Sequence, residues 1–256
     1  MKVFMTALLI VCLAFSASAS SALLPDGQQT AEGVIFKVFR TENRGYCEWY
    51  YPAEETRAML GAYIDGFSLK RVDFETIAAH PFSGLVVCRD DVEYYIHSDG
   101  FVEAFSLSLP SRSVAEGQTA FCELALSTAR EKLGLSYFFD PATITDVVSA
   151  TYAYQYFDLA NGGSDKTIAG SQTIAEPEKL EALCALLRGA EQTSAGCPFQ
   201  NLLTLTKSDG TAITIAVATD SCATFFVNGQ CFNYKSRQNS DVRAHDWFDE
   251  IPKGVY

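Results

Sequence analysis

The feature that most constrains the fold is a pair of similar short stretches, 117 positions apart. The run HPFSGLVV at 80–87 aligns with CPFQNLLT at 197–204. Upstream of each copy, a segment that opens with proline is predicted to be a helix, at 52–65 and at 177–188, and the second has the apolar spacing of one at Leu180, Leu183, Cys184 and Leu187. Proline is favoured in a first helical turn, where its missing N–H costs nothing. We therefore predict two related modules in one chain.

Strand-like runs surround each predicted helix in the same order. Two of them precede the helix, at 34–39 and 46–51 in the first module and at 147–157 and 166–174 in the second. Three more follow it. Each module is thus expected to read strand-strand-helix-strand-strand-strand, an antiparallel sheet with one helix packed on a face, which makes the fold class α+β.

Hairpin turns and two further helices complete the expected architecture. Asp-Gly or Asn-Gly pairs favour two-residue hairpins, because both residues tolerate positive φ. They occur at Asp99-Gly100, Asp209-Gly210 and Asn228-Gly229. The first module is expected at 33–109, a connecting helical segment at 110–142, and the second module at 143–256. That second module includes a short C-terminal helix with Ala244, Trp247, Phe248 and Ile251 on one face.

The first nineteen residues have the three parts of a secretory signal peptide. Met1 and Lys2 give a positive start, 3–15 is apolar apart from Thr6, and Ala17-Ser18-Ala19 is a small-residue exit. The apolar run is too short to span a bilayer, which needs about 20 residues. We therefore expect a signal peptide at 1–19, export, and no stable membrane insertion afterwards.

Charge narrows the choice of partner. The chain carries a net charge of −12 and has no cluster of lysine or arginine. Phosphate backbones and anionic lipid surfaces repel such a chain. Nucleic acid is therefore excluded as an expected partner, and an extracellular ligand or protein of unknown identity is expected instead.

Seven cysteines remain after the expected cleavage, so disulfides are expected outside the cytoplasm. If Asp209-Gly210 is a two-residue turn, the numbers of opposed residues sum to 419, and Cys197 then faces Cys222. Non-hydrogen-bonded partners lie about 4.5 Å apart at Cα, close enough for a bridge. We predict this disulfide. Cys122 and Cys184 fall on apolar helix faces and are expected in the core, whereas Cys47 and Cys88 could bridge within the first module.

Candidate chemistry is sparse. A Cys-His hydrolase could be built from Cys47 and His97, because thiol catalysis needs an imidazole beside the thiolate. However, Cys47 shows no helix N-terminus that would lower its pKa, and a strand position explains His97. Metal-binding spacings and phosphate-binding loops are absent from the sequence. No catalytic residue, metal or cofactor is predicted.

Tyrosines supply the remaining candidate contacts. Tyr152, Tyr154 and Tyr156 alternate along one predicted strand face. A solvent-facing ladder of this kind could stack on sugar rings or on a partner. Packing against the helix or across strands is the alternative, and the one that we favour.

The stretch 147–234 resembles uncharacterised extracytoplasmic domains of Gram-positive bacteria. Its strand-pair-helix opening, Cys197-Pro198-Phe199 and Asp220-Ser221-Cys222 carry the resemblance. The resemblance implies an extracytoplasmic domain, and it implies no enzymatic activity for this chain. We expect a secreted, non-catalytic binding or regulatory protein. The alternatives are a secreted hydrolase that uses Cys47 and His97, and a structural component of the cell envelope.

Overall fold

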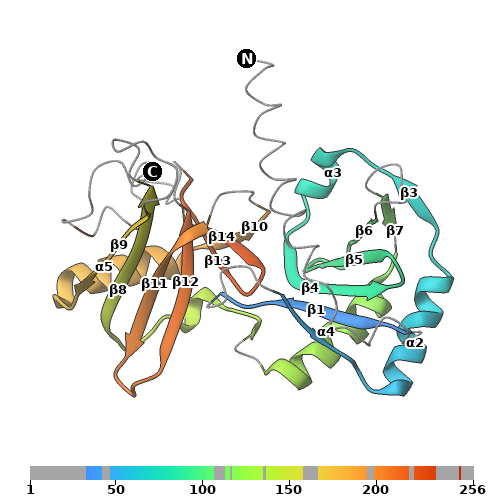
Figure 1. Ribbon diagram of the computed structural model, residues 1–256, viewed down its shortest axis with the longest axis horizontal. Helices are drawn as coiled ribbons and strands as arrows, with labels where there is room; N and C mark the ends of the chain where they lie inside the picture. Colours follow the sequence, from blue (N-terminus) through green and yellow to red (C-terminus); the bar gives the residue numbers. More distant parts are fainter. Residues whose placement is uncertain are drawn as a thin grey trace, which may run out of the picture.

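The computed structural model describes residues 33–41, 47–106, 113–115, 117–134, 137–157, 167–194, 199–218, 222–234 and 248. Two seven-stranded antiparallel sheets lie side by side, with several helices beside the first and one α-helix against the second among the described residues (Figure 1). The expected α+β class with two similar modules is confirmed. None of the helices in the described ranges is long and apolar enough to cross a membrane.

The first sheet has the strand order β2-β1-β4-β5-β6-β7-β3. Its strands are β1 (Ile35–Phe39), β2 (Cys47–Tyr50), β3 (Leu69–Arg71), β4 (Phe82–Arg89), β5 (Val92–His97), β6 (Val102–Phe105) and β7 (Ser113–Ala115). Its helices are α2 (Glu54–Asp65), α3 (Phe74–Ala78) and α4 (Thr119–Leu133). Helix α2 thus begins two residues after Pro52, whose position predicted the start.

Helices α2 and α4 share one face of the first sheet. Leu60 and Ile64 of α2 are buried together with Phe121, Ala125 and Ala129 of α4. These side chains recur at three- and four-residue spacing, so each helix presents one apolar stripe. The strands below contribute alternate residues to the same core, as a period of two requires.

The second sheet has the strand order β10-β14-β13-β12-β11-β8-β9. Its strands are β8 (Val147–Phe157), β9 (Thr167–Ile174), β10 (Glu191–Thr193), β11 (Phe199–Lys207), β12 (Ala212–Ala218), β13 (Thr224–Val227) and β14 (Gln230–Asn233). Helix α5 (Pro177–Arg188) packs on it, and the 3-10 turn η2 (Pro141–Thr143) leads in from the first module. Pro177 is the first residue of α5, as the sequence predicted.

The two sheets have the same topology. Reading the second order from its other end, each strand matches the first-sheet strand seven places earlier in the chain. The prediction of three strands after each helix is wrong, because five follow it. The missed strands include β3 and β10, three residues each, which come directly after the helix and close the far edge of each sheet. The expected C-terminal helix lies outside the described residues, apart from the buried Phe248.

Two of the three Asx-Gly turns are longer than the sequence predicted. Lys207 N donates to Thr211 O, which leaves a three-residue loop around Asp209-Gly210 in which only Gly210 has a positive φ. The Asp209 carboxylate accepts from Thr211 N instead, as in an Asx-turn. The 98–100 loop closes in the same way, with His97 N donating to Phe101 O. Only Asn228-Gly229 is a two-residue turn, with both residues at positive φ.

The register of the β11–β12 hairpin therefore differs from the predicted one. Opposed residues sum to 418 next to the turn, as in Thr206 with Ala212. They sum to 417 beyond a bulge, where Phe199 faces Ala218. The register argument for a bridge between Cys197 and Cys222 is thus wrong. The bridge itself stays a prediction, because Cys197 lies outside the described residues.

The turn at Asn228-Gly229 joins the two modules. Gly84 of β4 has a φ of 87°, and a Cβ there would lie 2.3 Å from the Asn228 carbonyl oxygen. Asn228 N donates to Thr41 Oγ1 over 2.9 Å, and Asn228 Nδ2 donates to the Tyr137 carbonyl over 3.2 Å. The second module thus places a tight turn against a glycine of the first.

Candidate functional site

The two faces of the first sheet differ in kind. One is the apolar core under α2 and α4. The opposite face carries ionisable side chains that project from β1, β5 and β6 at alternate positions, and we call it the polar face. Its members are Lys37, Glu93, Tyr95, His97 and Glu103. Lys37, His97 and Glu103 are buried, each at most 6% exposed. Burial of charged groups costs free energy unless they are paired, so their contacts decide what this face does.

One end of the polar face holds a chain of paired charges. Lys37 Nζ lies 2.8 Å from Glu93 Oε1, and the Tyr95 hydroxyl donates to Glu93 Oε2 over 2.7 Å. Burial and the Glu93 charge raise the pKa of Tyr95, so its hydroxyl keeps its proton. Lys37 Nζ also lies 5.7 Å from the ring of Trp49 and 5.9 Å from that of Phe39. A cation and half-buried aromatic rings therefore occur together there.

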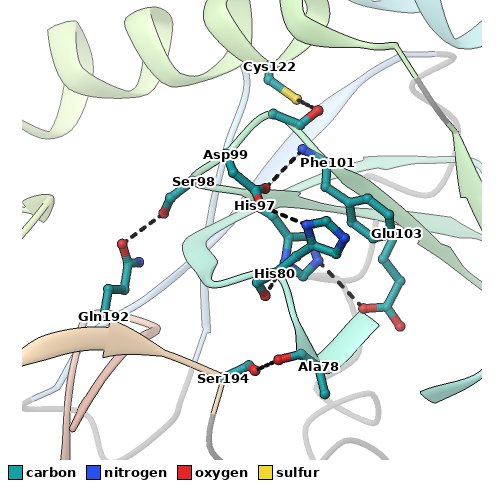
Figure 2. Close-up of polar contacts among 11 residues, drawn as sticks. Ala78, His80, His97, Ser98, Asp99, Phe101, Glu103, Cys122, Gln192 and Ser194 are labelled. Carbon is teal, nitrogen blue, oxygen red and sulfur yellow. Dashed lines mark hydrogen bonds and ion pairs between the residues drawn. The ribbon is translucent and has the colours of Figure 1, made fainter. Parts of the chain in front are cut away.

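The other end of the polar face holds two histidines. His80 Nδ1 lies 2.6 Å from Asp99 Oδ2, and its ring stacks on Phe101 at 3.8 Å and 6° (Figure 2). Asp99 Oδ1 also accepts from Phe101 N. Partial burial raises the pKa of Asp99, but the hydrogen bonds from His80 and Phe101 outweigh it, so the pKa is lowered overall. The His80 imidazole is thus oriented by a carboxylate, as general bases in enzymes are.

His97 lies beneath His80. Its Nδ1 lies 2.7 Å from the His80 carbonyl oxygen, and the two ring centroids are 6.1 Å apart. Its Nε2 is buried, and no described residue forms a hydrogen bond with it. Glu103 Oε2 lies 3.8 Å from that nitrogen, too far for a hydrogen bond (Figure 2).

Residues of the second module border the histidines. Gln192 Nε2 donates to the Phe82 carbonyl over 2.9 Å, and Ser98 Oγ donates to Gln192 Oε1 over 3.0 Å. Ser194 Oγ donates to the Ala78 carbonyl (Figure 2). The candidate site therefore lies where the segment around β10 docks on the first module.

The structure does not bring Cys47 and His97 together. Cys47 lies on β2 and His97 on β5, with β1 and β4 between them. Three strand spacings are about 14 Å. Burial raises the pKa of Cys47 and outweighs the nearby Lys37 charge, so its thiol is held in the weakly nucleophilic protonated form.

Burial also raises the pKa values of three other cysteines. Burial raises the pKa of Cys122 to about 12, and burial also raises the pKa values of Cys88 and Cys184. Both helix cysteines are buried in the cores, as predicted. Cys47 and Cys88 cannot bridge. They face opposite ends of β1, beside Phe39 and Ile35, far beyond the roughly 7 Å Cα limit of a disulfide.

The three tyrosines do not form a shared exposed face. Tyr152 is 1% exposed, and its hydroxyl accepts from Asn201 Nδ2 over 2.8 Å, so it packs in the core. Tyr154 is partly buried against Gly170 on the neighbouring strand, where a Cβ would lie 2.6 Å from the tyrosine oxygen. The side chain of Tyr156 lies outside the described residues. Tyr154 alone among the described tyrosines of this set stays a predicted ligand contact.

Sequence reasoning missed the pair of His80 and Asp99. Nineteen residues separate them, and they meet only because β4 and β5 pair in a register that contains a bulge between Phe82 and Leu85. The repeated HPF motif was the available signal, because it marked the position of His80 at the start of β4.

No metal centre is formed by the described residues, in which no three His, Cys, Asp or Glu side chains are placed to hold an ion. Comparison of the chain with protein-family models, with curated proteins and with solved structures gave no match. The resemblance to extracytoplasmic domains therefore stays a prediction.

Proposed function

We propose that this chain is an exported, non-catalytic binding or regulatory protein that acts outside the cytoplasm, and that it recognises its ligand at the polar face. One observation carries the proposal: ionisable and aromatic side chains occupy a sheet face that an apolar layer could fill. Replacing buried ion pairs by apolar side chains is often neutral or stabilising. Their presence therefore favours recognition over stability.

The chemistry of the Lys37 end indicates the class of ligand. Glu93, whose side chain is 22% exposed, offers a carboxylate that the buried Lys37 holds at 2.8 Å, and the half-buried Trp49 and Phe39 offer flat apolar surfaces beside it. A polar ligand with one flat face, such as a sugar ring, suits that combination, because it can stack on an aromatic ring while its hydroxyls bond to charged groups.

The state of the thiols supports binding over thiol chemistry. The described cysteines with shifted pKa values are all shifted upward by burial. A catalytic thiol needs the opposite shift and an imidazole in contact. Cys47 has neither, so Cys47→Ala is expected to leave ligand binding unchanged.

Tryptophan fluorescence tests the recognition site. The chain has two tryptophans, so a Trp247→Phe variant leaves Trp49 as its single reporter. Glucose, N-acetylglucosamine and a dialanine peptide serve as probes. We expect a saturable change in Trp49 emission with a saccharide. Lys37→Met should raise the dissociation constant of the saccharide about tenfold or more, because a hydrogen bond to a charged group contributes about 1.5–3 kcal/mol.

Glu48→Gln is the matched control. Glu48 lies on β2 next to Trp49, projects to the opposite side of the strand and pairs with Arg40 at the surface. It should leave the response unchanged. Emission that stays constant with every probe up to its solubility limit, or an equal effect of both substitutions, would contradict recognition at this face.

Export has its own test. Intact-mass analysis of protein recovered from the medium should show a mature start near Ser20. Material that is recovered outside the cell and still begins at Met1 would contradict signal cleavage.

A hydrolase is the second candidate, and the geometry favours His80 over Cys47 for it. His80 and Asp99 have the base-and-carboxylate arrangement of hydrolytic sites, at 2.6 Å. If the protein hydrolyses p-nitrophenyl esters, His80→Gln should remove that activity, whereas Cys47→Ala should not. Loss of activity in the Cys47 variant alone would restore the thiol mechanism.

A further inference from the structure

The contacts that dock the β10 segment end next to the two histidines. The Phe82 and Ala78 carbonyls, which accept from Gln192 and Ser194, each lie two residues from His80. Ser98, which donates to Gln192, directly follows His97. A change in either imidazole therefore acts on the backbone that holds the second module.

The protons of His97 can be placed from its contacts. The His80 carbonyl oxygen can only accept, so His97 Nδ1 carries a hydrogen and donates it. In the neutral ring Nε2 then has only a lone pair. It faces Glu103 Oε2, also an acceptor when ionised, at 3.8 Å. Two buried acceptors face each other without a hydrogen between them.

We propose that binding of a proton at His97 Nε2 tightens the docking of the β10 segment on the first module. The proton comes from solvent, and no other bond is made or broken. The new N–H donates to Glu103, and a charge-assisted bond of this kind is about 2.7–2.9 Å long. Closure from 3.8 Å turns the His97 side chain. Its Nδ1 bonds to the His80 carbonyl, so the turn acts on the backbone from Ala78 to Phe82, whose carbonyls accept from the β10 segment. The proposal is independent of the proposed ligand.

Other ionisable groups surround His97, and they have partners of their own. The group nearest to Nε2 is Glu103 of β6. The others are His80 before β4, Asp99 in the turn, Tyr95 and Glu93 on β5, Lys37 on β1, and Cys122 of α4, whose thiol donates to the Gly100 carbonyl. His80 is bonded to Asp99, and Tyr95 and Lys37 are bonded to Glu93. The unpartnered nitrogen of the cluster is therefore that of His97.

The direction in which docking depends on pH follows from that geometry. Imidazoles ordinarily titrate near pH 6.5. Because the proton completes the contact with Glu103, docking is tight when both ring nitrogens carry a hydrogen and loosens when Nε2 has none. A protein released from the cell meets such changes in pH, so docking would respond to its surroundings.

Nuclear magnetic resonance of the full mature chain, labelled with ¹⁵N at histidine and glutamine, tests this from about pH 5 to about pH 8, where imidazole titrates. The His97 Nε2 shift reports the proton, and the Gln192 side-chain amide reports docking. We expect both to move with one midpoint, and the Gln192 signal to broaden or exchange faster on the alkaline side.

Three variants make the result decisive. His80→Gln should keep the coupling of His97 to Gln192, whereas His97→Gln should abolish the titration at Gln192. If His97→Gln does not fold, Glu103→Gln, which keeps the imidazole, should move the shared midpoint to lower pH. The proposal is overturned if the Gln192 side-chain amide signal stays constant while the His97 Nε2 shift changes with pH. It is also overturned if His80→Gln abolishes the titration at Gln192, or if the His97 ring never gains the second proton.

Discussion

Replacing Gly84 by alanine should destabilise the protein far more than the same change at a second glycine of equal backbone conformation. Gly84 has a φ of 87° and Gly210 a φ of 83°. The left-handed conformation costs an alanine about 1–2 kcal/mol at either position. At Gly210 nothing lies within 4 Å of the added Cβ, so that cost is the whole effect.

At Gly84 the added Cβ also meets another module. It would lie 2.3 Å from the Asn228 carbonyl oxygen, more than 1 Å inside the 3.4 Å at which ordinary contact begins. That atom belongs to backbone and cannot rotate away, so the turn must move off β4. The movement breaks the bonds of Asn228 to Thr41 and Tyr137, each contributing about 1 kcal/mol.

The sum for Gly84→Ala is about 3–4 kcal/mol, against about 1–2 kcal/mol for Gly210→Ala. At about 2–4 °C per kcal/mol for a chain of this size, the first variant should melt about 10 °C below the wild type and the second about 4 °C below. Calorimetry of the three proteins measures both. Equal melting temperatures for the two variants would refute the inference that this glycine is required by the contact between modules.

Other outcomes follow from single contacts. Tyr137→Phe should lower the free energy of unfolding by about 1–3 kcal/mol in chemical denaturation, because it leaves the buried Phe39 N–H without its acceptor; no change would mean that another group replaces it. The pKa of Asp99 is lowered in the folded state, so its stabilisation is present above the ordinary carboxyl pKa and is lost as pH falls through the folded value. In Asp99→Asn the free energy of unfolding should therefore fall less steeply than in the wild type as the pH is lowered. If the two proteins lose stability in parallel, the assignment to Asp99 is wrong. Non-reducing peptide mapping should join Cys197 to Cys222, and a different partner for Cys197 would end that prediction.

The sequence contained the order of the large elements but not their exact pairing. The repeat and the proline-led helices predicted both modules because apolar periodicity and proline geometry act locally. Strand β10 was missed because three residues, one exposed and two half-buried, leave no periodic signal. The hairpin register failed for a related reason. An Asp-Gly pair suits a two-residue or a three-residue loop, and the side-chain bond from Asp209 to Thr211 decides between them.

The candidate site was the least predictable part. His97 was noticed only beside Cys47, and the partner that the fold gives it is Glu103. In β1 one lysine alternates with apolar residues, a pattern that usually means that one face of the strand is exposed to solvent. The burial of Lys37 could therefore not be predicted from the sequence. Which face is covered is decided by elements distant in sequence.

The contact of the Asn228-Gly229 turn with the first module constrains the order in which the two modules can fold. Thr41 and Asn228 are 187 positions apart, so this contact cannot form until nearly all of the protein has been synthesised. Local contacts within the first module can form much earlier, and contacts of high sequence separation are slow. Gly84 and Thr41 of the first module therefore stay uncovered while the second module is synthesised. A chain that stops before residue 228 would leave that surface uncovered permanently.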